Sequence, residues 1–310
     1  MKIVFLDEYS ICGCDLSTIK SMGEYTGYET TSAEQTLERC KGAEVVITNK
    51  VILDAETLAA LPDLRLICVA ATGMNNVDLV AAAELGIEVR NAVGYSTYSV
   101  AEATISSALA LFREVIYYDE YFKSGRYAAS DRIFNFDRPT AQLRGKNWGI
   151  IGMGNIGREV ARLAEAFGCK IGYYSTSGIA RDESYKQLQL NELLAESDIV
   201  SIHCPLNERT KNLIDISELQ QMKESAILIN VARGGIVNEQ ALADALNNGI
   251  IRGAALDVYT AEPLRLSPLY NLKEPYRLLA SPHNAWSSVE AIERLVSCIS
   301  KNIEEYKNKL

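Results

Sequence analysis

Long apolar runs are missing from this 310-residue chain. A transmembrane helix needs about 20 consecutive apolar residues, and no stretch approaches that length. The N-terminal stretch MKIVFLDEYS has a short apolar run that stops at Asp7 and Glu8, whereas a signal peptide needs a longer run and a small-residue cleavage site. We therefore expect a cytoplasmic protein without a membrane partner.

The chain also lacks the cysteine spacing of a metal or redox site. Its seven cysteines are odd in number and scattered, which is typical of reduced thiols in a cytoplasm. Cys12 and Cys14 enclose one residue, whereas the C-x-x-C of a redox motif or a zinc knuckle encloses two. We expect no bound metal ion.

Positive charge is in deficit. Lysine and arginine together number 31, against 40 aspartates and glutamates, so the formal net charge is −9. This balance disfavours nucleic acid and anionic membranes as partners. It still allows a local basic pocket that binds a small anion.

What the chain does contain is an alternation of short β-rich runs and helical patterns, which is typical of a parallel sheet covered by helices. The alternation breaks at a long helical stretch, residues 99–125, and an aromatic, aperiodic stretch, residues 126–146. It then resumes, so the sequence predicts two doubly wound α/β domains. The predicted strands are 2–7, 44–49, 65–72, 87–93, 147–154, 169–175, 198–205, 225–233, 251–258 and 277–283, and a terminal amphipathic helix covers 287–310.

The stretch IIGMGNIGREVARLAEAFGCKIGYYSTSG, residues 150–178, matches the motif G-x-G-x-x-G at Gly152, Gly154 and Gly157. It follows a predicted strand and opens a predicted helix, as a dinucleotide site requires. The first glycine permits a tight turn, the second lets the backbone approach a pyrophosphate, and the third lets helix pack on strand. The N–H groups at the helix start, around Asn155 and Ile156, would face the phosphates. A glycine-rich turn without a ligand is the alternative.

The carboxylate expected about 20 residues after the motif is missing. Ser175, Thr176 and Ser177 stand there, and Arg181 follows. A carboxylate would bind the ribose 2′-OH of NAD and repel the 2′-phosphate of NADP, whereas hydroxyls and an arginine can bind that phosphate. We therefore expect NADP preference or dual specificity. In the alternative, this is a solvated turn and another group recognises the ribose.

Only two histidines, His203 and His283, are available as acid or base, and both follow predicted strands. Because ligands bind beyond the carboxyl ends of such strands, position alone does not choose between them. Arg233, Asp257 and Glu262 also follow strands in this half of the chain. An arginine clamps a carboxylate, and a glutamate favours the protonated form of a neighbouring histidine. With hydride from a nicotinamide, such a set fits reduction of a carbonyl beside a carboxylate, although a surface salt bridge explains each residue singly.

Several segments together resemble the D-2-hydroxyacid dehydrogenase family: ATGMNNVDL, GYSTYSVAEATISSALAL, GIIGMGNIGREVA, HCPLNERTKNLI, LINVARGGIVNEQAL, ALDVYTAEP and SPHNAW. They run in family order from about residue 65 to 290. The resemblance implies a flavodoxin-like substrate domain, residues 1–98 plus 288–310, and a Rossmann NAD(P)-binding domain, residues 99–287. It implies an active site between the two domains.

The resemblance also implies roles for single residues. Arg233 matches the arginine that binds the substrate carboxylate and carbonyl, His283 the acid/base, and Glu262 its partner. The Thr72–Gly73 backbone matches the loop that receives the substrate carboxylate. His203 is then left with packing beside the cofactor. The remaining cofactor positions implied are Asp257 at the nicotinamide carboxamide, Thr104 beside the nicotinamide, Cys204 and Pro205 near the adenosine, and Thr210 and Val231 within the matching segments.

The segment FNFDRP, residues 134–139, resembles the aromatic segment of the glycerate dehydrogenase/hydroxypyruvate reductase branch. In that branch it can approach the partner subunit's active site, through Phe134 or Phe136 in this numbering. We therefore expect a homodimer formed through the cofactor domain and a small polar 2-oxo acid such as hydroxypyruvate or glyoxylate. Two alternatives stay open: a dinucleotide-sensing, corepressor-like interaction module on the same fold, and a methyltransferase, which leaves Arg233, Glu262 and His283 unexplained.

Overall fold

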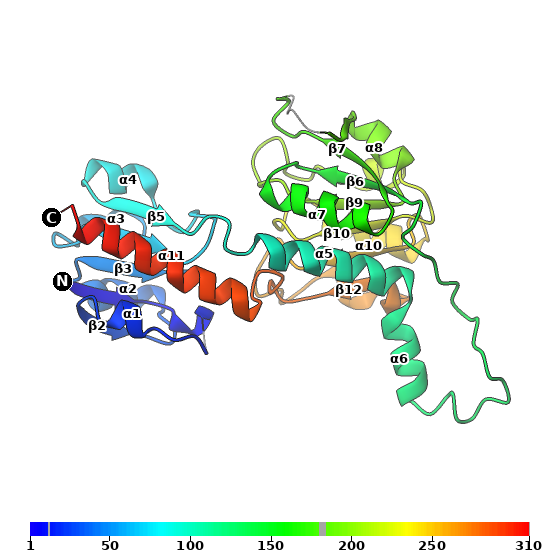
Figure 1. Cartoon of the computed structure of the whole chain (residues 1–310), viewed down its shortest axis with the longest axis horizontal. Helices are drawn as coiled ribbons and strands as arrows, with labels where there is room; N and C mark the ends of the chain where they lie inside the picture. Colours follow the sequence, from blue (N-terminus) through cyan, green and yellow to red (C-terminus); the bar gives the residue numbers. More distant parts are fainter. Residues whose placement is uncertain (12, 180–183, 310) are drawn as a thin grey trace. The chain divides into compact units, whose positions relative to one another are not determined.

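The chain is described by a computed structural model over residues 1–11, 13–179 and 184–309. It divides into two compact units, each drawn in Figure 1. The first unit joins Met1–Ser96 to Ser287–Leu310, and the second unit is Thr97–Trp286. The sequence placed these boundaries at 98/99 and 287/288.

The first unit is built on a five-stranded sheet in which every neighbouring pair of strands is parallel. The strand order is β2-β1-β3-β4-β5, the flavodoxin-like order. Strands β1, β3 and β4 are almost wholly buried, because helices cover both faces of the sheet. The strands are β1 (Lys2–Phe5), β2 (Glu24–Gly27), β3 (Val45–Thr48), β4 (Leu66–Val69) and β5 (Glu88–Asn91).

Side-chain caps begin three helices of the first unit. Asp54 and Asp78 accept backbone N–H bonds in the first turns of α3 and α4, and Ser288 does the same for α11. The long helix α11 brings the C-terminal end of the chain back onto this unit and packs against β4 (Figure 1). The helices are η1 (Glu8–Ile11), α1 (Ser17–Lys20), α2 (Ala33–Cys40), α3 (Ala55–Ala59), α4 (Leu79–Glu84) and α11 (Val289–Lys307).

The second unit contains a seven-stranded, all-parallel sheet in the order β12-β11-β10-β9-β6-β7-β8. The chain starts in the middle and reverses direction across the sheet between β6 and β9, as in a Rossmann fold. The predicted class, two doubly wound parallel-sheet domains, is confirmed. The strands are β6 (Asn147–Ile151), β7 (Lys170–Tyr174), β8 (Lys186–Gln187), β9 (Ile199–Ile202), β10 (Ile227–Asn230), β11 (Gly253–Leu256) and β12 (Leu278–Ala280).

Helices cover both faces of this sheet, and α5 packs along α7 (Figure 1). None of the helices in the described ranges is long and apolar enough to span a membrane. The helices of the second unit are α5 (Thr97–Phe112), α6 (Val115–Lys123), α7 (Asn155–Ala166), α8 (Leu190–Glu196), α9 (Ile216–Leu219), α10 (Glu239–Asn247), η2 (Pro268–Asn271) and η3 (Pro275–Arg277).

The single helix predicted for residues 99–125 is wrong, because the helix breaks into α5 and α6 at Glu114. This residue has a left-handed backbone conformation, with φ of +52°. Its side chain is only 11% exposed and pairs with Arg138 (3.1 Å) and Arg252 (3.0 Å). These two partners come from distant parts of the chain, so local periodicity could not reveal the break. Beyond it, α6 and residues 124–139 project from the second unit as an arm (Figure 1).

Candidate functional site

The carboxyl ends of the parallel strands in the second unit form one edge of its sheet, and most predicted site residues follow those strands. The glycine loop follows β6, the Ser175 turn follows β7, and Cys204 follows β9. We call the loops after β6, β7 and β9 the cofactor edge. Arg233, Glu262 and His283 follow β10, β11 and β12, which are neighbours in the sheet. We call the loops after these three strands the catalytic edge.

The three glycines of the loop after β6 serve different needs. Gly152 has φ of +98°, and a Cβ there would lie 2.8 Å from the backbone nitrogen of Cys204. A Cβ on Gly157 would lie 2.3 Å from the carbonyl oxygen of Gly152, so this glycine permits close packing. A Cβ on Gly154 would meet nothing within 4 Å. Gly154 therefore keeps open a space against the backbone, which is what a pyrophosphate needs.

Helix α7 begins at Asn155, directly after Gly154, without a side-chain cap. The first N–H groups of a helix have no partner within the helix, and they favour an anion. The start of α7 can therefore bind the dinucleotide phosphates through the amides around Asn155 and Ile156. This donor set, together with the space beside Gly154, fits the group that the motif predicts.

The turn after β7 is organised around Ser175. This side chain is buried, and its hydroxyl donates to the carbonyl of Ile179 (3.0 Å) and lies 3.2 Å from Ser177 Oγ. Thr176 is half-buried and Ser177 is exposed, so they are the hydroxyls nearer to solvent. Arg181, the cation predicted beside this turn, lies outside the described residues.

A pocket of about 530 Å³ lies between the glycine loop and the loop after β9. Cys204 and Pro205 line it, as the resemblance implies. Burial raises the pKa of the Cys204 thiol to about 11, so this group stays protonated and inert. We call this the glycine-side pocket; its lining residues are Gly152, Met153, Gly154, Ser175, Thr176, Ser177, His203, Cys204, Pro205, Asn207, Glu208 and Arg209.

Thr210 stabilises the loop after β9 from inside. It is wholly buried, and its hydroxyl donates to the carbonyl of Pro205 (2.7 Å) and accepts from the N–H of Asn207 (2.8 Å). Its side chain therefore shapes the pocket wall. Arg209, which precedes it, lines the pocket and is a residue that the sequence reasoning missed. The sequence does contain one indication of this wall: Asn207 and Thr210 are spaced for a turn directly after a predicted strand.

His203 also lines the glycine-side pocket, but its ring belongs to a buried chain of hydrogen bonds. Trp148 Nε1 donates to Ser201 Oγ (2.8 Å), which lies 3.0 Å from His203 Nε2. His203 Nδ1 is buried without a hydrogen-bond partner among the described residues. Burial lowers the pKa of His203 to about 3, so the ring is neutral near pH 7 and has no proton to supply as an acid.

His283 is held differently. Its Nδ1 lies 2.6 Å from Glu262 Oε2, and Glu262 Oε1 accepts the N–H of Tyr259 (3.0 Å). The His283 backbone is left-handed, with φ of +54°, and its carbonyl accepts from Trp286 Nε1 (2.9 Å). Because Nδ1 is bound to the glutamate, Nε2 is the ring atom available for proton transfer. Glu262 and His283 are thus hydrogen-bonded to each other, and the acid/base role that the resemblance implies for them stays a prediction.

Asp257 anchors the loop that carries His283. This buried carboxylate accepts from Ser281 Oγ (2.6 Å) and from the N–H groups of Asn284 (2.9 Å) and Ala285 (3.0 Å). A carboxylate offers about four lone-pair positions, so one stays available to a ligand amide. In this structure its hydrogen bonds position the acid/base loop.

The loop after β10 places Arg233. Asn230, buried at the end of β10, donates to the carbonyl of Arg233 (2.9 Å) and accepts from the N–H of Ala232 (3.1 Å). A Cβ on Gly234 would lie 1.9 Å from the carbonyl oxygen of Tyr259, so only glycine lets the β10 and β11 loops meet. Arg233 itself is exposed, and within the described ranges its side chain donates only to its neighbour's carbonyl, on Ala232 (2.7 Å). Asn230 and the contact at Gly234 were missed by the sequence reasoning.

Four further predicted residues are placed as follows. Val231 is half-buried against the core of the second unit. Thr104 is wholly buried in α5 and donates to the carbonyl of Val100 (2.8 Å), so its side chain presents no atom to solvent. Thr72 and Gly73 belong to the first unit, in the loop after β4, where the Thr72 carbonyl accepts from Asn91 Nδ2 (2.6 Å).

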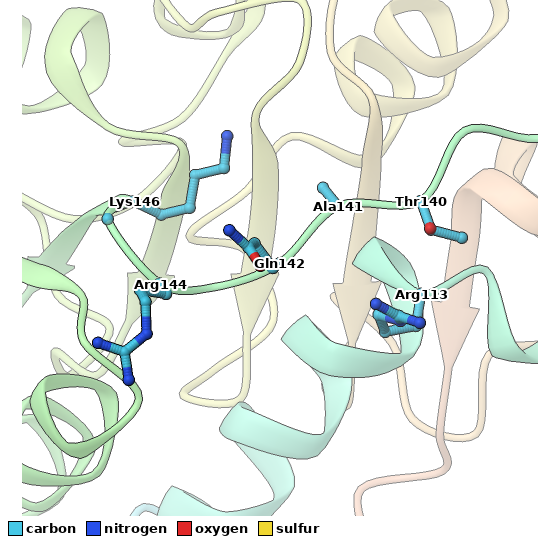
Figure 2. A pocket seen from close by; sticks show the side chains of 7 residues that line it. Arg113, Thr140, Ala141, Gln142, Arg144 and Lys146 are labelled. Carbon is cyan, nitrogen blue, oxygen red and sulfur yellow. The ribbon is translucent and has the colours of Figure 1, made fainter.

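A second, basic pocket of about 470 Å³ lies where α5 ends and the chain enters β6, away from the carboxyl ends of the strands. Figure 2 shows that Lys146 and Arg144 point to opposite sides of the segment and that Arg113 lies at its far end. Because these side chains do not converge on one point, they do not form a binding site for a phosphate. Most of the residues predicted to bind the cofactor lie instead at the carboxyl ends of the strands. No group of three potential metal ligands occurs within the described ranges.

Comparisons with known proteins agree with this geometry. The family model for the NAD-binding domain of D-isomer specific 2-hydroxyacid dehydrogenases matches residues 105–285. A Haemophilus influenzae protein assigned as a 2-hydroxyacid dehydrogenase is 44% identical over 100% of this chain and 99% of its own. A glycerate dehydrogenase of Methylorubrum extorquens is 38% identical over 98% and 96%. A solved acyclic imino acid reductase in complex with NADPH and D-Arg superposes with a TM-score of 0.88, at 28% identity over 100% and 98%.

Proposed function

The chain belongs to the D-isomer specific 2-hydroxyacid dehydrogenase family, enzymes that act on CH–OH donors, and we propose that its substrate is a small polar 2-oxo acid. Hydroxypyruvate and glyoxylate are the compounds we favour, and each would be reduced to the 2-hydroxy acid, in the D form where the product is chiral. The similarity to a glycerate dehydrogenase supports this choice.

The observation that carries the proposal is the Glu262–His283 pair. Its 2.6 Å contact orients the imidazole and leaves Nε2 for the substrate. Protonated His283 gives its Nε2 proton to the carbonyl oxygen as that oxygen becomes a hydroxyl. Arg233 binds the substrate carboxylate and polarises the carbonyl, because a guanidinium presents paired donors. When a reduced dinucleotide is bound, its nicotinamide would supply the hydride to the carbonyl carbon.

For the cofactor, we propose NADP(H) preference or dual use. The turn Ser175–Thr176–Ser177 provides hydroxyls where a carboxylate would repel a 2′-phosphate. The NADPH complex of the imino acid reductase is consistent with such a site on this fold.

We also propose a homodimer formed through the second unit. The arm carries a run of exposed apolar side chains, among them Ile133 (76% exposed), Phe134 (70%) and Phe136 (84%). Exposed aromatics gathered on a projecting segment are typical of an interface. Light scattering on the eluted protein should give twice the mass of one chain, and Phe134→Ser with Phe136→Ser should reduce it.

The test of the activity is the initial rate of absorbance loss with NADPH and with NADH. Each cofactor is paired with hydroxypyruvate, glyoxylate, pyruvate and a branched 2-oxo acid. We expect the fastest turnover with hydroxypyruvate or glyoxylate, and D-glycerate as the product of the former. Arg233→Ala should lower kcat/KM for these acids by orders of magnitude while the exposed position leaves the fold intact. No turnover with any pair would contradict the proposal.

A further inference from the structure

Two pockets meet at the turn after β7. One is the glycine-side pocket. The other, of about 400 Å³, we call the outer pocket; it is lined by Tyr174, Ser175, Thr176, Gly178, Gln187, Leu188, Gln189 and Arg209. Ser175, Thr176 and Arg209 belong to both linings. A ribose 2′ substituent lies at the residues that follow the second strand of such a fold, which here is this shared wall.

Arg209 is the only cation among the described residues that line either pocket. Its side chain is exposed, and it forms no ion pair or hydrogen bond with any residue in the described ranges. Among the residues that the structure describes, Glu208 is the only anion in either lining, and it lines the glycine-side pocket alone. The positive charge therefore reaches both pockets, whereas the negative charge reaches one.

The loop that carries Arg209 is held by its own hydrogen bonds. Asn207 Oδ1 accepts the N–H of Arg209 (2.9 Å), and the carbonyl of Asn207 accepts the N–H of Thr210 (3.0 Å). The buried Thr210 hydroxyl ties the same turn to Pro205. The backbone beneath Arg209 is thus fixed, and only its side chain must order when an anion binds.

Ser175 contributes less than its position suggests. Its hydroxyl hydrogen is already donated to the carbonyl of Ile179, so it is not available to a phosphate. Thr176 supplies a hydroxyl, and Ser177 supplies one when its hydrogen turns from Ser175 Oγ to the ligand, but hydroxyls alone carry no charge to balance a dianion. A guanidinium supplies both the charge and paired donors.

We propose that Arg209, on the loop after β9, is the residue that recognises the 2′-phosphate of NADP(H), with Thr176 and Ser177 completing the site. This inference rests on the proposed use of a pyridine dinucleotide. It places the charge that determines cofactor specificity on the loop after β9, and not on the segment directly after β7. It also predicts that Arg181 is not required for the discrimination.

The experiment measures binding without chemistry. Adenosine 2′,5′-bisphosphate and 5′-AMP are titrated by calorimetry into the full chain and into Arg209→Gln, Arg209→Lys, Arg181→Gln and Lys211→Gln. Lys211 is the matched control, because it is an exposed cation two residues away that lines neither pocket. We expect the parent to bind the bisphosphate at least about tenfold more tightly than 5′-AMP.

That ratio should fall to near one in Arg209→Gln, stay intermediate in Arg209→Lys, and persist in Arg181→Gln and Lys211→Gln. The KM for NADPH in Arg209→Gln should rise about tenfold with kcat unchanged, because the contact is made equally throughout the reaction. A ratio that survives in Arg209→Gln, is lost in Arg181→Gln or Lys211→Gln, or is absent in the parent overturns the inference. Because binding is read without a 2-oxo acid, failure of the proposed activity would show separately as absent turnover.

Discussion

The two halves of the carboxyl edge in the second unit are built on opposite principles. At the catalytic edge, side chains bind one another: Glu262 holds His283, Asp257 holds the loop around it, and Asn230 holds the loop of Arg233. At the cofactor edge, the first backbone amides of α7 have no side-chain cap and lie beside a pocket. Arg209, which lines that pocket, has no side-chain partner among the described residues. One half is preorganised by the protein's own hydrogen bonds, and we propose that the other half is completed by a dinucleotide.

This difference has a physical reason. A proton donor must hold its geometry before the substrate arrives, because reorganisation during the reaction adds to the barrier. A dinucleotide brings its own negative charge and many hydrogen-bond acceptors, so unpaired donors at its site are satisfied on binding. Changes at the catalytic edge should therefore affect kcat or stability, whereas changes at the cofactor edge should affect binding.

The largest effect is expected at His283. His283→Ala removes the proton donor and should lower kcat by about 10²- to 10⁴-fold, the usual contribution of a positioned acid. Glu262→Gln keeps the shape but removes the charge opposite Nδ1, so its loss of kcat should be smaller. Steady-state rates with saturating cofactor measure both, with circular dichroism to confirm folding. Near-normal kcat in His283→Ala would remove the acid/base role from this edge.

A pair of glycine substitutions separates the two edges directly. In Gly234→Ala the new Cβ would lie 1.9 Å from the Tyr259 carbonyl oxygen, so the loops must separate, at a cost of about 1–3 kcal/mol in unfolding free energy. In Gly154→Ala the Cβ meets nothing, so stability should change by less than about 1 kcal/mol. Dinucleotide affinity should nevertheless fall at least about tenfold, because the methyl group occupies the space for the pyrophosphate.

Denaturant unfolding and dinucleotide titration measure the two effects on the same samples. The comparison between the edges breaks down if Gly154→Ala lowers stability as much as Gly234→Ala does. It also breaks down if Gly154→Ala leaves dinucleotide affinity at the parent value.

The smallest effect concerns pH and His203. Burial lowers its pKa from 6.5 to about 3, so below pH 6.5 the unfolded chain binds a proton that the folded chain does not. The free energy of unfolding should therefore fall as pH drops from 6.5 toward 3, by at most about 1.4 kcal/mol per pH unit from this group. Above pH 6.5 the group contributes no pH dependence.

His203→Gln removes this titration. The stability difference between parent and variant should shrink as pH falls from 7.5 to 5, because only the parent loses this term. Chemical denaturation at several pH values measures it, and carboxylates common to both proteins cancel in the difference. Parallel curves for the two proteins would place His203 in contact with solvent and weaken its contrast with His283.

Much of this organisation follows from local sequence. The buried strands β1, β3 and β4 could be predicted from their unbroken apolar runs, which occur because helices cover both faces of the sheet. The edge strand β2, with the sequence EYTG, has no such run and was not predicted, because solvent reaches part of it. The two-residue strand β8 was not predicted for the same reason, because both of its residues are exposed.

Single residues divide in the same way. The glycine motif and the polar residues after each strand could be predicted, because spacing and strand ends are local properties. Glu114 could not, because its arginine partners lie 24 and 138 residues away. In the sequence, nothing distinguishes Arg209 from other exposed charged residues. The structure does, because it places the Arg209 loop beside the turn after β7.

The sequence by itself determined the two α/β domains, the dinucleotide loop and the short choice of acid/base residues. These depend on patterns within one element or at its end. The resemblance already favoured His283 over His203, whereas only the tertiary structure gives the physical difference between the two rings and points to Arg209 among the cations. Burial beside Ser201 keeps one ring neutral, and a glutamate from the neighbouring loop orients the other. Such surroundings come from segments far apart in the chain, and the protonation of a side chain depends on what the fold places beside it.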